Sequence, residues 1–115
     1  MSKSTGCHWL NIGCSDLALQ FDVYRMSDSR LVLVLSHDVL DWLNLRQVAP
    51  LILRSKSGKP TLWLNPLVEV DGQVYVLKPE LMATVPLRQL SLRVTNLSHH
   101  REDFIRALDL LFTGV

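Results

Sequence analysis

The chain has 115 residues, with 12 Lys and Arg against 11 Asp and Glu, so its formal net charge is only +1. Hydrophobic residues make up 48% of it and charged residues 20%, a composition that indicates one globular domain with a modest core and excludes a largely disordered chain. The near-neutral charge gives no general reason to bind nucleic acid directly, and no apolar run is long enough to cross a membrane.

Residues 1–19 are rich in Ser, Gly and Cys and show no periodicity, so we expect an N-terminal extension that is disordered or loosely packed. An upstream start codon in place of the true one would explain such a segment; the alternative is a regulatory or packing arm that carries Trp9. Cys7, His8 and Cys14 offer three soft ligands without a fourth at zinc spacing, so we expect neither a metal site nor another cofactor. Two cysteines in so apolar a chain indicate a reduced, cytoplasmic setting without a disulfide framework.

Short apolar and β-branched runs follow, and they are typical of strands. Residues 21–25 and 31–35 are separated by Ser27-Asp28-Ser29, which predicts a hairpin turn. A third run, residues 47–53, ends in the polar loop 54–60, and residues 61–64 could pair briefly before Pro66.

Residues 67–70 and 73–76 flank Asp71-Gly72, the strongest hairpin signal in the chain, because both central residues of a type I′ turn need positive φ. Residues 87–94 form a further expected strand. Six or seven short strands followed by one helix predict a mainly β fold, a small barrel-like antiparallel sheet closed by that helix.

The last twenty residues predict a helix that runs almost to the chain end. Ser98 is a favoured N-cap, and Glu102 and Asp103 fall in the first turns, where acidic groups suit the helix dipole. Most of the helix circumference is apolar, and the polar remainder lies in one narrow stripe at i, i+4, i+7 and i+11: Glu102, Arg106, Asp109 and Thr113. A helix this apolar should pack on a core and also contact a partner near its end.

Several motifs could suggest an enzyme, and each has a simpler explanation. Gly58-Lys59 lacks the other residues of a phosphate-binding loop, and His37-Asp38 would point to opposite faces of a strand. His99 and His100 at the helix start are typical of neutral surface histidines. No Ser or Cys has a general base at a readable spacing, so we expect no catalytic residues.

An ordered set of motifs resembles the CcdB toxins of plasmid-addiction modules. Gln-Phe-Asp-Val-Tyr at 20–24 is similar to the Gln-Phe-x-Val-Tyr that opens those toxins, and Leu-Ser-His at 97–99 with Ala-Leu-Asp-Leu-Leu-Phe-Thr-Gly-Val at 107–115 is similar to their C-terminal helix, which typically ends Phe-Trp-Gly-Ile. Between them lie Ser-His-Asp-Val-Leu-Asp at 36–41, Arg to Pro at 46–50, Leu-Asn-Pro-Leu-Val at 64–68 and Met-Ala-Thr-Val-Pro at 82–86, each similar to a family motif in the same order.

The resemblance implies an SH3-like barrel of the type that CcdB and MazF toxins share, formed by residues 20–115 as a cytoplasmic homodimer. It implies a non-enzymatic toxin of a type II toxin–antitoxin module that serves plasmid maintenance. Such a toxin binds the A subunit of DNA gyrase, traps the enzyme with cleaved DNA, and is neutralised by the disordered arm of a CcdA-like antitoxin. By position, the expected gyrase-binding residues are Val39, Leu40, Asp109, Phe112, Thr113, Gly114 and Val115. Core packing is the alternative role for Val39, Leu40 and Phe112.

One departure affects this expectation. The family Trp that stacks on a gyrase arginine is Thr113 here, and the helix Asn one turn earlier is Asp109. An Asp109 carboxylate on the same helix face could pair with that arginine instead. The alternatives are a CcdB-fold protein that no longer poisons gyrase or has another target, and a MazF-like endoribonuclease, although the Arg-Gly-Asp-Ile-Trp segment and Gly-rich Arg-Pro stretch of that class are absent.

Overall fold

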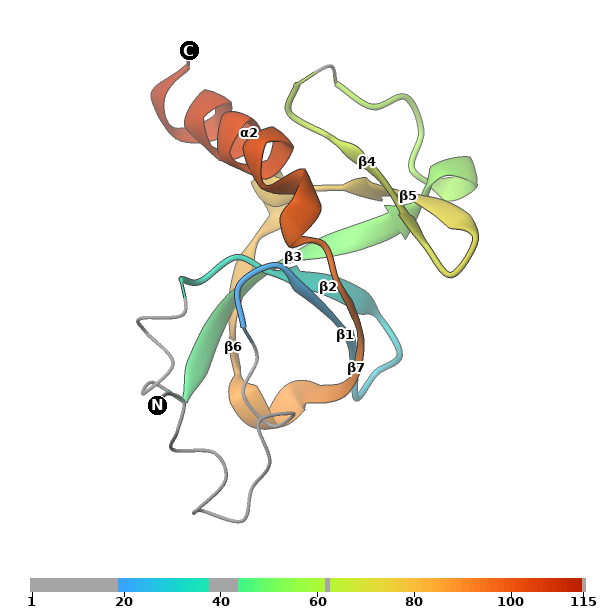
Figure 1. Cartoon of the computed structure of the whole chain (residues 1–115), viewed down its shortest axis with the longest axis vertical. Coiled ribbons are helices and arrows are strands. Elements are labelled where there is room, and N and C mark those ends of the chain that lie inside the picture. The colour runs from blue at the N-terminus through green and yellow to red at the C-terminus, as the bar shows by residue number, and fades with distance from the viewer. Residues whose placement is uncertain (1–18, 38–43, 62, 115) are drawn as a thin grey trace.

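The computed structural model describes residues 19–37, 44–61 and 63–114 (Figure 1). Seven strands form one curled antiparallel sheet in the order β4-β5-β3-β2-β1-β7, with β6 paired to β3. The strands are β1 (Asp22–Met26), β2 (Leu31–Val34), β3 (Leu45–Leu53), β4 (Leu67–Val70), β5 (Gln73–Leu77), β6 (Ala83–Pro86) and β7 (Leu90–Asn96). One helix, α2 (Arg101–Thr113), follows them. The expected mainly β fold with a C-terminal helix is confirmed, as a half-barrel.

The long strand β3 joins the two parts of the sheet. Its first half, from Leu45 to Val48, pairs with β6, and its second half, from Leu51 to Leu53, pairs with β5. A 3-10 turn, η4 (Pro79–Leu81), connects β5 to β6, and the two strands pair with successive parts of β3. The β4–β5 hairpin therefore lies beside α2, at the opposite end of β3 from the barrel-like part (Figure 1).

Apolar side chains are buried on both faces of the curled sheet, which explains why its central strands do not alternate. In β2, Leu31 and Leu33 belong to the core beneath α2 and the β4–β5 hairpin, whereas Val32 and Val34 belong to the core inside the barrel. All four residues are buried. A strand covered on both sides is a continuous apolar run, as this one is.

The two expected hairpin turns are confirmed. Asp71 has φ 53° and Gly72 has φ 80°, the two positive values that a type I′ turn requires. In the turn between β1 and β2, the Arg30 backbone N–H donates to Asp28 Oδ1 at 3.1 Å. That hydrogen bond holds the pKa of Asp28 below its usual value, together with the Arg30 guanidinium beside the carboxylate.

Three expectations for the elements need correction. Among the described residues of the segment 61–64, Trp63 and Leu64 form a turn and not a strand, because the Leu64 and Asn65 N–H groups both donate to the Thr61 carbonyl. The expected strand 87–94 begins with a 3-10 turn, η5 (Leu87–Gln89), and only Leu90–Asn96 is strand. Residues 83–86, for which the sequence pattern predicted no strand, form β6 because they pair with β3.

The predicted N-cap is also wrong. Residues Ser98–His100 form a 3-10 turn, η6, and α2 begins after it at Arg101, with no side-chain cap on the helix start. The Ser98 backbone N–H donates to Asn96 Oδ1 at 2.9 Å, so Asn96 stabilises this turn in place of a Ser98 cap. Glu102 and Asp103 do lie in the first helical turn. Among the described segments, no helix is long and apolar enough to span a membrane.

Candidate functional site

The first half of α2 is fixed against the sheet. Phe104 and Ala107 are fully buried, and the Phe104 ring lies 5.1 Å from that of Phe21, between centroids. Phe21 has φ 68°, a strained value for a bulky residue. Backbone hydrogen bonds from Phe21 N–H to Val34 and from Leu97 N–H to the Phe21 carbonyl hold it there. The buried aromatic pair thus positions the helix over the sheet.

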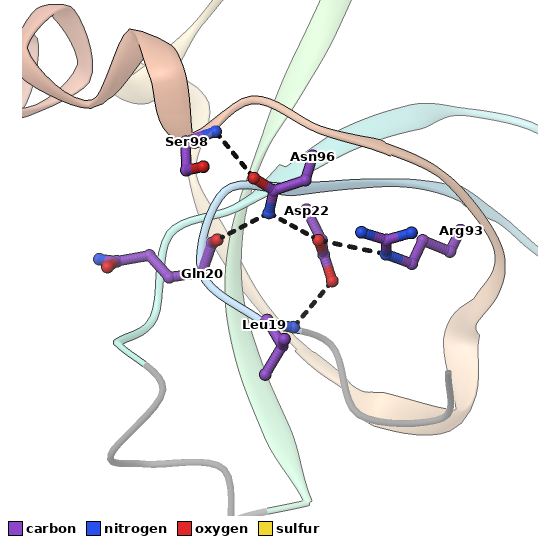
Figure 2. Close-up of polar contacts among 6 residues, drawn as sticks. All are labelled: Leu19, Gln20, Asp22, Arg93, Asn96 and Ser98. Carbon is purple, nitrogen blue, oxygen red and sulfur yellow. Dashed lines mark hydrogen bonds and ion pairs between the residues drawn. The ribbon is translucent and has the colours of Figure 1, made fainter. Parts of the chain in front are cut away.

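A buried carboxylate ties the start of β1 to the segment that leads into α2 (Figure 2). Asp22 is fully buried, and its two oxygens accept from Leu19 N–H at 3.0 Å and Asn96 Nδ2 at 2.8 Å. Arg93 Nε lies 3.2 Å from the same carboxylate. Asn96 in turn accepts from Ser98 N–H, so this network sets where η6 begins. The sequence reasoning gave Asp22 and Asn96 no role; a lone Asp in an apolar strand was the available signal.

The end of α2 is exposed. Asp109, Phe112, Thr113 and Gly114 are all exposed, and the Phe112 side chain is 70% exposed. Gly114 has φ 77° and its N–H donates to the Leu110 carbonyl at 3.0 Å, which ends the helix in a left-handed cap. Core packing for Phe112 is therefore wrong. The remaining expected site residues, Val39, Leu40 and Val115, lie outside the described residues.

A groove of about 490 Å³ lies beside Phe112, between α2 and the start of β3. Its apolar walls include Phe112, Leu108, Met82 and Leu45, the last 49% exposed. Polar contacts hold the adjoining backbone: Ser36 Oγ accepts from Gln47 N–H, and Thr84 Oγ1 donates to Gln47 Oε1. An exposed aromatic next to an apolar groove with fixed walls is suited to protein recognition.

Thr113 and Asp109 differ in what they offer a partner. The Thr113 hydroxyl donates to the Asp109 carbonyl at 2.6 Å, so its one donor is used within the helix and only its oxygen lone pairs remain as acceptors. The Asp109 carboxylate accepts no hydrogen bond and forms no ion pair within the described part of the chain. A charged acceptor is therefore available one turn from Phe112.

The other chemistry-bearing residues do not assemble into a site. The His99 and His100 rings lie 4.4 Å apart between centroids, and His100 Nδ1 is 3.7 Å from Asp103. His37 is exposed, outside any strand, so the expectation that it points from a strand does not apply. Within the described residues, no three His, Cys, Asp or Glu side chains gather as a metal site. Cys7, His8 and Cys14 lie outside those residues.

Fold and surface together define the class: a small half-barrel with one C-terminal helix, whose exposed helix end and apolar groove are suited to a macromolecular partner. A comparison with protein families narrows this class to one family, because residues 20–114 match the family described as CcdB protein. The chain therefore belongs to the CcdB family, whose members are toxins of toxin–antitoxin modules. The resemblance inferred from the ordered motifs is confirmed.

A solved structure described as an endoribonuclease from Mycobacterial species is similar in fold. It superposes with a TM-score of 0.66 at 14% sequence identity, covering 81% of this chain and 88% of that one. At that identity the likeness concerns the fold alone. It agrees with the expected barrel-like fold.

Proposed function

We propose that this protein is a toxin that binds the A subunit of DNA gyrase and traps the complex with cleaved DNA. The observation that carries the proposal is the exposed Phe112 at the end of α2, beside Asp109 and Gly114, in a chain of the CcdB family. Such inhibition needs no chemistry in the toxin, since a ligand that binds one state of its target more tightly shifts the target toward that state. We therefore propose a non-enzymatic, cytoplasmic protein without a cofactor.

The contact with gyrase would be made by Val39, Leu40, Asp109, Phe112, Thr113, Gly114 and Val115. Phe112 supplies the aromatic anchor and the Asp109 carboxylate pairs with a gyrase arginine, in place of the aromatic stacking that Thr113 cannot provide. An aromatic side chain stacked on a guanidinium contributes on the order of 2 kcal/mol, roughly thirty-fold in affinity. Thr113 loses that contribution, so the toxin would bind gyrase markedly more weakly unless the Asp109 contact replaced it.

The partners follow from the same proposal. Two copies form a homodimer that presents the helix ends together, and the disordered arm of a CcdA-like antitoxin binds the apolar surface in competition with gyrase. DNA is reached through gyrase rather than bound directly. Residues 20–115 are the toxin domain, so a chain that starts at Leu19 should keep its fold and activity; loss of either would contradict that division.

Growth of bacteria that express the protein tests the proposal. Expression should arrest a strain with sensitive gyrase and spare an otherwise identical strain whose gyrase A subunit is insensitive to CcdB. Arrest of both strains would contradict gyrase as the target. Cleavage of RNA by the purified protein, with gyrase supercoiling untouched, would favour the ribonuclease alternative that the fold likeness raises.

A further inference from the structure

A second concave site lies beside the middle of α2, away from the groove at Phe112. It is a pocket of about 340 Å³ between the segment that precedes β4 and the helix. The segment contributes Pro60, Trp63, Pro66 and Leu67, and α2 contributes Asp103 and Arg106. The proposed function gives none of these residues a role.

The segment before β4 holds Trp63 in an unfavourable backbone conformation and leaves its side chain accessible. Trp63 has φ 71°, and its side chain is 55% exposed. The buried Asn65 fixes the segment: its Oδ1 accepts from Thr61 N–H at 2.9 Å, and its Nδ2 donates to the Leu77 carbonyl and to Glu80 Oε1, both at 3.0 Å. Strain of this kind persists only where the surroundings enforce it, and it is concentrated at binding and catalytic sites.

Arg106 is oriented by the exposed indole. Its guanidinium carbon lies 4.8 Å from the centroid of the Trp63 ring. Within the described residues Arg106 forms no hydrogen bond or ion pair, and the neighbouring Asp103 lies instead 3.7 Å from His100. A stacked guanidinium presents its N–H groups in a fixed plane, which suits bidentate binding of a carboxylate.

The surrounding charges limit what can bind. Arg106 is the one cation among the residues that line the pocket; Asp103 lines it as well, and Glu102 and Asp109 lie on adjacent turns of the same helix. These carboxylates would repel a run of phosphates or acidic side chains, whereas a single carboxylate held by Arg106 is tolerated. The two prolines, the indole and the half-exposed Leu67 form an apolar wall next to that position.

We propose that this pocket binds an extended, mostly apolar segment of a partner protein that carries a single Asp or Glu. The carboxylate pairs with the Arg106 guanidinium, and a neighbouring apolar side chain packs on Trp63, Pro60 and Pro66. The pocket volume matches one or two side chains. This binding is independent of the proposed action on gyrase.

A random-peptide library displayed on phage and selected on the immobilised full chain tests the proposal. The enriched peptides should carry Asp or Glu next to Leu, Ile or Phe. In fluorescence anisotropy, the best peptide should bind at least ten-fold more tightly than its Asn or Gln analogue. Arg106→Gln should weaken that peptide at least ten-fold and Arg106→Lys should weaken it less, because Lys keeps the charge and loses the bidentate geometry.

Arg88→Gln is the matched control, since it removes one exposed arginine from outside the pocket and should leave binding unchanged. Circular dichroism of each variant confirms folding, and the Trp63 indole N–H signal in NMR, assigned by Trp63→Phe, should shift with the peptide. Failure to enrich any peptide, enrichment without a carboxylate, or equal weakening by Arg88→Gln and Arg106→Gln would overturn the proposal. A shift of the same indole signal on addition of an eight-nucleotide oligouridylate would also overturn it, because the pocket would then bind RNA and not a protein segment.

Discussion

At the scale of single residues, Asp22 has the most direct structural role. Its carboxylate is fully buried and links the backbone of Leu19 to the side chain of Asn96, with Arg93 beside it (Figure 2). Because Arg93 is itself half exposed, the hydrogen bonds matter more than the ion pair.

Asp22→Ala should therefore lower the free energy of unfolding by about 1–3 kcal/mol, the cost of leaving buried polar partners unpaired. Urea denaturation followed by circular dichroism measures it. Asp28→Ala is the control, since Asp28 is an exposed turn residue that pairs with Arg30, and its urea midpoint should stay close to that of the unmodified protein. Equal midpoints for the two variants would show that the Asp22 network does not stabilise the fold.

In the proposed function, Asp109 and Thr113 decide how gyrase is recognised. If the Asp109 carboxylate replaces the family Trp, Asp109→Ala should abolish growth arrest, and Thr113→Trp should enhance it by restoring the aromatic contact. Glu102→Ala, two turns earlier in the same polar stripe, should leave toxicity unchanged. Unchanged toxicity of Asp109→Ala would refute the compensation, while leaving Phe112 as the anchor.

At the scale of elements, α2 has two halves with different roles, and two phenylalanines separate them. Phe104 is fully buried against Phe21, so Phe104→Ala should cost about 3–5 kcal/mol of stability in urea denaturation. Phe112 is 70% exposed, so Phe112→Ala should change stability by less than about 0.5 kcal/mol and yet remove toxicity. A large loss of stability in Phe112→Ala would place that ring in the core and remove it from the surface.

The elements also show how much could be predicted from the sequence. The Asp71-Gly72 hairpin and the body of α2 could be predicted, because turn chemistry and helical periodicity are local signals. The true start of α2 could not be predicted, because the tertiary network through Asp22 and Asn96 holds the segment at Ser98 in a 3-10 turn. β6 depends on pairing with β3, and the backbone of Trp63 depends on contacts made by Asn65. Neither appears in a short window of sequence.

The candidate site was expected from family resemblance and not from a local sequence pattern. Family resemblance pointed to the end of α2, and the structure shows Asp109, Phe112, Thr113 and Gly114 exposed together there. The groove beside them could not be predicted, because it brings Leu45 and Met82, which are distant in sequence, next to the helix. The pocket at Trp63 and Arg106 joins residues more than forty positions apart, so sequence spacing carries no signal for it.

At the scale of the whole molecule, the exposed apolar groove bears on oligomeric state. Leu45, on the sheet side of the groove, is 49% exposed, and a homodimer would cover it while Phe112, at the end of α2, stays open to gyrase. Light scattering should give twice the chain mass of 13.1 kDa. Leu45→Lys should shift the mass toward one chain, because a charge buried in an apolar interface is costly. Leu92→Lys is the control: Leu92 is 60% exposed, lies on β7 outside the groove, and its substitution should leave the mass unchanged. A dimer unaffected by Leu45→Lys would place the interface elsewhere.

The most direct test of gyrase poisoning uses purified components. Gyrase, supercoiled DNA and ATP are incubated with the protein, the reaction is stopped with detergent and protease, and linear DNA is measured on a gel. We expect linear DNA to accumulate with sensitive gyrase and not with gyrase whose A subunit is insensitive to CcdB, and we expect Phe112→Ala to remove the effect. Gyrase that supercoils normally in a large excess of the folded protein, with no cleaved DNA, would contradict the proposal.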